Sequence, residues 1–354
     1  MPTRRSFLAG LSVMAVIPAL AACGSDSTDA SPSTGSSGSA AAGFVAEAGA
    51  FPVTITHKYG ETTLESAPKR VVCIGLTDQD ALLALGLVPV GVTYWFGDKE
   101  LQGIYPWATE ALGDADLPEL LEDADGLQIE KIAALAPDLI IGQYSGLTEQ
   151  DYKTLSGIAK VVAQSGDYAD YGTPWDEAAL RIGTAIGKPA AAQEIIDTVK
   201  QRIADEAAAH PEFQGQTAAT ITPYEGLFLY GPEDPRSRLL VDLGFDLPPL
   251  ITEADDSEFG VSLSSERTTD LNDIGVAVWL DLGGDKQVEK IFQGTTAYEE
   301  GRWFDLNEED NGSYYVAHSF VTPLSLPYLL DRYVPQLVAA SDGDPATEVP
   351  AEKG

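Results

Sequence analysis

Aromatic side chains are the residues of this sequence that most clearly suggest a chemical role. They follow the ends of apolar segments, where burial is not required. A core would hold most of its aromatics inside strands, whereas flat, amphipathic rings at strand ends suit a cleft for a bulky organic ligand. We expect about half of them to pack at the edges of the fold instead. The set comprises Tyr94, Trp95, Tyr144, Tyr168, Tyr171, Tyr224, Tyr230, Trp279 and Tyr315.

Arginines are scarce and form the second set of candidate binding residues. Arg236, Arg238 and Arg302 lie in the second half of the chain and could donate hydrogen bonds to an anionic ligand. Two alternatives remain open. Arg302 follows Glu299 and Glu300, which allows a local surface ion pair, and Arg238 could simply open a helix.

Several classes of function are excluded by what the sequence lacks. It has no glycine-rich phosphate loop, no nucleophile elbow and no His-Glu-x-x-His stretch. Its three histidines are too few for the usual site of a bare transition metal, and we expect no cofactor. With 55 acidic against 21 basic residues the net charge is −34, which would repel nucleic acid.

Alternating strand and helix patterns predict an α/β fold of two Rossmann-like lobes joined by one long α-helix. The first lobe spans 51–188, the linking helix 189–210 and the second lobe 211–340. We predict strands at 70–74, 88–93, 138–142, 160–163, 217–221, 226–230, 274–280 and 313–316. Helices are predicted at 79–85, 129–135, 149–155, 174–186, 189–210, 238–243, 288–292 and 327–337.

The two ends of the chain are predicted to lie outside the fold. Residues 1–22 combine a paired-arginine start with a short apolar run, as in a signal peptide, and resemble a twin-arginine export signal. The following Cys23 lies where a bacterial lipoprotein signal places its lipidated cysteine. Residues 23–50 are rich in Ser, Gly and Ala and predict a flexible tether, and 341–354 predict a disordered acidic tail.

Four stretches resemble one known family, the substrate-binding lipoproteins of ABC importers for iron–siderophore complexes, haem and cobalamin. They are RVVCIGLTDQDALLALGLVPVG (70–91), IEKIAALAPDLIIG (129–142), SSERTTDLNDIGVAVWL (264–280) and PLSLPYLLDRYVPQL (323–337). The resemblance covers about residues 52–340. It implies two α/β lobes joined by one rigid helix, with the ligand between them.

The resemblance also implies a function and partners. The chain would be a monomeric, lipid-anchored extracytoplasmic receptor, not an enzyme, that binds an iron(III)–siderophore complex and delivers it to an ABC importer permease. Nine residues are then the expected ligand-binding set: Tyr94, Trp95, Tyr144, Tyr168, Tyr230, Arg236, Arg238, Trp279 and Arg302. In that family one glutamate on each lobe meets permease arginines, and Glu130 and Glu266 match those positions.

Three alternatives remain at this point. A haem or cobalamin receptor of the same transporter type would use Tyr144 or His318 as an axial ligand to haem. A secreted hydrolase would need an exposed nucleophile beside a base, which the histidines are poorly placed to supply. A purely structural surface lipoprotein would bind no small molecule saturably.

Overall fold

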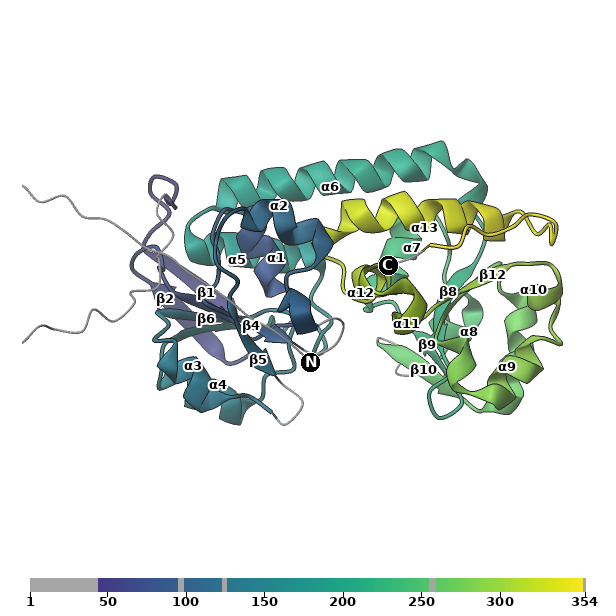
Figure 1. Ribbon diagram of the computed structural model, residues 1–354, viewed down its shortest axis with the longest axis horizontal. Helices are drawn as coiled ribbons and strands as arrows, with labels where there is room; N and C mark the ends of the chain where they lie inside the picture. The colour runs from purple at the N-terminus through teal and green to yellow at the C-terminus, as the bar shows by residue number, and fades with distance from the viewer. Residues whose placement is uncertain (1–43, 95–98, 123–125, 255–258, 353–354) are drawn as a thin grey trace, which may run out of the picture. The chain divides into compact units, whose positions relative to one another are not determined.

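A computed structural model describes residues 44–94, 99–122, 126–254 and 259–352 (Figure 1). The predicted signal peptide, Cys23 and Trp95 lie outside these residues. No helix in the described ranges is both long and apolar enough to span a membrane.

The first lobe is built on a five-stranded parallel sheet with the order β5-β4-β3-β6-β7. Helices cover the sheet, so its central strands are buried on both faces and are apolar throughout. The strands are β3 (Val71–Cys73), β4 (Gly91–Tyr94), β5 (Glu119–Glu122), β6 (Leu139–Gly142) and β7 (Lys160–Ala163), preceded by the hairpin β1 (Val53–His57) and β2 (Gly60–Leu64). The helices are α1 (Asp78–Ala84), η1 (Lys99–Leu101), η2 (Pro106–Ala108), α2 (Thr109–Leu112), α3 (Ile129–Ala134), α4 (Glu149–Ser156) and α5 (Trp175–Ile186).

One helix, α6 (Pro189–Ala209), connects the two lobes and contributes to the core of each. Its proline occupies the first turn, where the missing N–H costs no hydrogen bond. Ala192 and Ile196 are buried in the core of the first lobe, whereas Val199 and Ile203 are buried in the core of the second. With 21 residues α6 is about 30 Å long. Figure 1 shows it running beside α5 and then beside α13 (Ser325–Ser341).

The second lobe has a mixed sheet with the order β10-β9-β8-β11-β12. The strands β8, β11 and β12 are parallel, while β9 is antiparallel to both β8 and β10. The strands are β8 (Ala218–Thr222), β9 (Leu227–Tyr230), β10 (Gly260–Leu263), β11 (Val276–Leu280) and β12 (Trp303–Leu306). Besides α13, the helices are η3 (Pro211–Phe213), α7 (Pro235–Asp242), α8 (Pro249–Thr252), η4 (Ser265–Asp273), η5 (Leu282–Gly284), α9 (Lys286–Phe292), α10 (Thr296–Glu299), α11 (Glu308–Asn311) and α12 (Ser313–Ser319).

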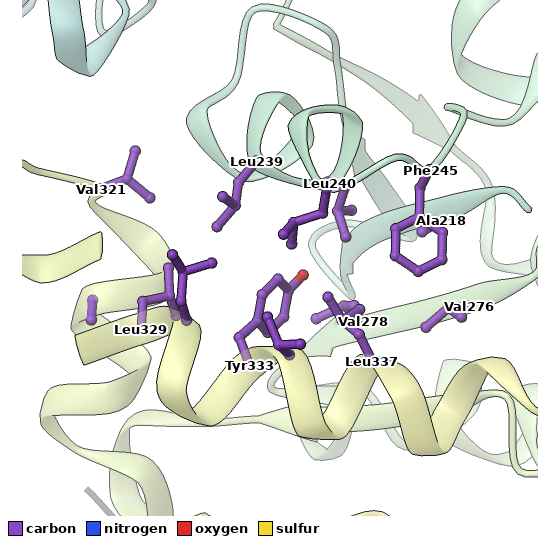
Figure 2. Close-up of a cluster of buried hydrophobic side chains, with 14 of the residues drawn as sticks. Ala218, Leu239, Leu240, Phe245, Val276, Val278, Val321, Leu329, Tyr333 and Leu337 are labelled. Carbon is purple, nitrogen blue, oxygen red and sulfur yellow. The ribbon is translucent and has the colours of Figure 1, made fainter. Parts of the chain in front are cut away.

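The main core of the second lobe lies between this sheet and α13. Leu329, Tyr333 and Leu337 recur at helical spacing along one face of α13 and point toward the sheet and α7 (Figure 2). Figure 2 also places Leu239 and Leu240 of α7 on the other side of this cluster. The packing fixes α7, and thereby the arginines in its first turns, against the lobe.

The structure differs from the sequence prediction at 313–316, which forms part of the helix α12 and not a strand. The run Ser-Tyr-Tyr-Val has strand-forming residues, which led to the prediction. Tertiary packing prevails, because Tyr314, Ala317 and His318 bury one helical face.

Residues of both predicted unstructured ends contact the fold. Phe44 packs against the first lobe, and the Glu47 carboxylate accepts hydrogen bonds from the N–H groups of Ala190 and Ala191 at the start of α6. At the other end, Gln336 Nε2 donates to the carbonyl of Pro350 at 2.7 Å. Parts of the tether and the tail are therefore attached to the fold.

Candidate ligand cleft between the lobes

Tyr144 follows β6 at the carboxyl edge of the first sheet, where ligands bind in open α/β folds. A buried carboxylate fixes this loop. Asp78, in the first turn of α1, accepts from the backbone N–H groups of Gln143 at 2.7 Å and Tyr144 at 3.1 Å. The position of the tyrosine therefore depends on an acid 66 residues earlier in the chain.

Tyr144 lies among aromatic rings from both lobes. Its ring contacts Tyr171 of the first lobe and Phe320 of the second edge-on, with centroids 5.6 and 5.8 Å away. Burial raises the pKa of its phenol, and the charge of Asp234 raises it further against the opposing effect of Arg236. The phenol is thus protonated at neutral pH and available as a hydrogen-bond donor.

Arg236 and Tyr230 form the second-lobe side of this cluster. The guanidinium Nε and Nη2 of Arg236 donate to the two oxygens of Asp234, each at 2.8 Å, in a bidentate pair. The same guanidinium stacks 3.7 Å from the centroid of the Tyr230 ring. As a residue at a strand end, Tyr230 was expected to lie at the carboxyl edge of the parallel strands. This expectation is wrong, because β9 is antiparallel to β8. Tyr230 instead joins the cluster through its contact with Arg236 of α7.

Tyr168 and Arg238 lie where the first lobe meets α7. The Tyr168 hydroxyl donates to Glu177 at 2.9 Å, and the Arg238 guanidinium lies 5.6 Å from the Tyr168 ring centroid. Arg238 Nη1 also donates to the carbonyl of Gly172 at 2.7 Å. Glu233 of the second lobe accepts from Ala169 N at 3.1 Å. Tyr168 of the first lobe and Arg238 of the second, both predicted binding residues, are thus in contact.

Asp80 forms a further connection between the lobes that sequence reasoning missed. One of its oxygens accepts from Trp107 Nε1 at 2.7 Å and from the Thr322 hydroxyl of the second lobe at 2.6 Å. Trp107 in turn packs against Tyr328 of α13 at 5.3 Å. The signal in the sequence is a pair of acids, Asp78 and Asp80, in the first turn of a helix that continues as Ala-Leu-Leu-Ala.

Two small cavities lie beside these contacts. One is bordered by Asp80 and Trp107 of the first lobe and by Phe320 of the second. The other is bordered by Asp78 and Tyr144 of the first lobe and by Pro235 of the second. Residues from both lobes therefore border each of these two separate cavities, and each cavity has a volume of about 20 Å³.

The structure does not place Trp279 and Arg302 with the other predicted residues. Trp279 is fully buried in the core, where its ring packs against Phe292 at 4.9 Å. Arg302 precedes β12, at the amino edge of the sheet. There it donates to the carbonyl of Ile274 and forms an ion pair with Glu300 at 2.8 Å, which is the alternative that its neighbours suggested. Neither residue therefore belongs to the proposed binding set.

The remaining predicted residues have mixed outcomes. Tyr94 ends β4, half-buried on the same sheet edge as Tyr144. Trp95 lies outside the described residues. The predicted strand at 313–316 would place His318 just after a strand, but the structure places it in a helix. It is buried in α12, where burial lowers its imidazole pKa to about 3 and the ring packs 4.9 Å from that of Tyr333. An imidazole enclosed in this core is not an accessible axial ligand for haem. Among the described residues no group of His, Cys, Asp and Glu gathers as a metal site.

The two predicted docking glutamates are exposed, one on each lobe. Glu130 lies in the first turn of α3, which follows the carboxyl end of β5. Glu266 lies in the first turn of η4, directly after β10. Because β10 runs in the same direction as β8, both glutamates lie at carboxyl edges of their sheets. Neither forms an ion pair with any residue in the described ranges.

Stability is expected to fall as the pH rises from about 4 to about 6. Burial raises the pKa values of Asp78 and Asp80 to about 6, whereas an unfolded aspartate titrates near about 4. In this range the native state holds protons that the unfolded chain releases, and each carboxyl contributes on the order of 1–3 kcal/mol. Thermal melts at acidic and neutral pH would measure the effect. Asp80→Asn should reduce this pH dependence, and an unchanged profile would contradict it.

The described residues thus form two α/β lobes with a connecting helix, and aromatic side chains of both lobes meet around Tyr144. A family model described as "Periplasmic binding protein" matches residues 71–309, and the chain belongs to this family. It is accordingly a binding protein and not an enzyme. The predicted family and fold class are both confirmed.

Several similar proteins have names or titles that state a ligand. The Fe(3+) dicitrate-binding periplasmic protein FecB of Escherichia coli (strain K12) is 30% identical over 224 residues, which are 60% of this chain and 68% of that protein. A probable siderophore-binding lipoprotein of Bacillus subtilis (strain 168), YfiY, is 30% identical over 43% of this chain and 44% of its own length. The crystal structure of Streptococcus pneumoniae TIGR4 PiaA in complex with ferrichrome is 29% identical, with a TM-score of 0.72, covering 82% of this chain and 99% of that one.

Proposed function

We propose that this protein binds a ferric siderophore between its lobes and delivers it to an ABC importer permease. The observation that carries the proposal is the cluster of Tyr144, Tyr171, Tyr230, Phe320 and Arg236, contributed by both lobes. Aromatic faces suit the organic periphery of a chelate, and phenol and guanidinium groups supply hydrogen-bond donors to its oxygens.

The relatives support this class of ligand. FecB is named for Fe(3+) dicitrate, YfiY for a siderophore, and PiaA was crystallised with ferrichrome. The alternative of a haem receptor loses one of its two candidate axial ligands, because His318 is enclosed in the second-lobe core, and retains the other, Tyr144.

The proposal includes a lipid anchor and a permease partner. Cys23 would carry acyl chains that hold the protein at the outer face of the cell membrane, with residues 24–43 as a spacer. Export by the twin-arginine route is proposed from Arg4 and Arg5. Glu130 and Glu266 would contact the permease, and the protein would act as a monomer.

Tryptophan fluorescence provides the test of the proposed ligand class. We expect saturable quenching when ferric siderophores are added, because Trp107 and Trp175 border the two cavities. Iron-free siderophores and free ferric ion should cause no saturable change. If free ferric ion alone bound, or if no ferric siderophore in a broad panel bound, the proposed function would be wrong.

A further inference from the structure

The charge of Arg236 is balanced within the protein. Asp234 is fully buried and accepts two hydrogen bonds from the guanidinium and one from the backbone N–H of Arg236 at 2.9 Å. Both carboxylate oxygens are committed to this arginine. The pair therefore carries no net charge, and three of the five N–H groups of the guanidinium are not used by the carboxylate.

The other charges around the cleft are mostly negative. The second cation, Arg238, is directed to the carbonyl of Gly172 and the ring of Tyr168. A third guanidinium, that of Arg181, donates to Gln143 and interacts with Glu177. Against these three guanidinium groups stand five carboxylates that border the cavities or contact the residues around them. They are Asp78, Asp80, Glu177, Glu233 and Asp234. At pH 7.5 the two buried aspartates of α1, with pKa values of about 6, carry most of their charge.

The whole chain, at −34, adds a field of the same sign. An anionic ligand would thus approach a negative protein and meet a negative cleft.

We propose that the cleft selects ferric chelates without negative charge, of the trihydroxamate type, and rejects polyanionic ones such as ferric triscatecholates and ferric citrates. Three hydroxamates of charge −1 neutralise Fe³⁺, whereas three catecholates of charge −2 leave a net charge of −3. A neutral complex can accept hydrogen bonds from Arg236 and Tyr144 without opposing the carboxylates. This selectivity rests on the proposed function and would separate the chain from FecB, which is named for the dicitrate complex.

Equilibrium titrations with chelates of different charge test the selectivity. The probes are ferric ferrichrome, which is neutral, ferrioxamine B, which is cationic, a ferric triscatecholate and ferric citrate. Like charges across an interface are costly enough that we expect the triscatecholate to bind at least about 100-fold more weakly than ferrichrome. The difference should shrink between about 20 mM and about 500 mM salt, because salt screens repulsion.

Two variants connect the selectivity to named residues. Asp234→Asn keeps an oxygen for the Arg236 N–H but removes the charge that balances the guanidinium. The ratio of the affinity for ferrichrome to that for the triscatecholate should therefore fall by about 10-fold or more. Glu233→Gln makes the same change of charge without altering the Arg236 pair, and should lower this affinity ratio by a smaller factor. Glu233→Gln provides the test on its own if Asp234→Asn does not fold. Glu289→Gln, on the surface helix α9, is the matched control and should leave the discrimination unchanged.

The outcomes separate the two proposals. Equal or tighter binding of the triscatecholate or of ferric citrate would overturn the charge selectivity and leave the siderophore function standing. Discrimination that stays constant in Asp234→Asn and Glu233→Gln would also overturn it, because these cleft carboxylates would then not be its cause. If no ferric chelate of any charge bound, the siderophore function itself would fail.

Discussion

Replacing both Glu130 and Glu266 with alanine is expected to reduce siderophore uptake to the level of cells that lack the protein. The two carboxylates are exposed, lie on different lobes and have no ion-pair partner among the described residues. Two charge pairs at opposite ends of a docking surface fix the orientation of a binding protein on its partner. Removing both takes away this orientation and the electrostatic attraction that forms the complex.

The same double substitution should leave ligand affinity and melting temperature nearly unchanged. Exposed residues without specific contacts typically alter stability by less than about 0.5 kcal/mol. A matched control is the pair Glu110→Ala and Glu253→Ala, which removes one exposed helix-associated acid from each lobe at other positions and should retain uptake. Normal uptake by the Glu130/Glu266 variant, or an equal loss of ligand affinity, would exclude the docking role.

Trp279→Ala is expected to lower the free energy of unfolding by about 3–5 kcal/mol, as for other large aromatic residues removed from a core. The side chain is fully buried in β11, which lies between β8 and β12, and packs against Phe292 of α9. Small shifts of the surrounding strands cannot fill the cavity that remains, because the strand is hydrogen-bonded to neighbours on both sides.

Urea denaturation followed by circular dichroism would measure this loss. Tyr224→Ala is the control for an aromatic residue outside the core, since 68% of Tyr224 is exposed, and it should change stability by less than about 0.5 kcal/mol. If Trp279→Ala kept its stability and lost ligand affinity, Trp279 would belong to the binding site after all.

The error at Trp279 has a physical origin. Strand β11 is buried on both faces, so its residues are apolar without alternation, and the sequence does not indicate which way each side chain points. Arg302 was a candidate because arginines are scarce, and scarcity does not give the position of a side chain. The residue directly precedes β12 and forms the ion pair with Glu300 that its neighbours had suggested.

Other parts of the site were predictable because their signals are local. The run Leu-Ile-Ile-Gly before Gln143 and Tyr144 marks a buried strand that ends at a turn, and Pro189 marks the start of α6. In contrast, the contact between Asp80 and Thr322 joins residues 242 positions apart, and no local pattern contains it. Contacts between the lobes therefore required the structure.

Hydrogen exchange with and without a ferric siderophore is the most direct test of binding between the lobes. In the bound state we predict slower amide exchange in 142–146 and 168–172 of the first lobe and in 230–238 and 319–323 of the second. Little change is expected on the outer helices α4 and α9. Protection confined to one lobe, or found mainly on α4 or α9, would contradict a binding site formed by both lobes around Tyr144 and Arg236.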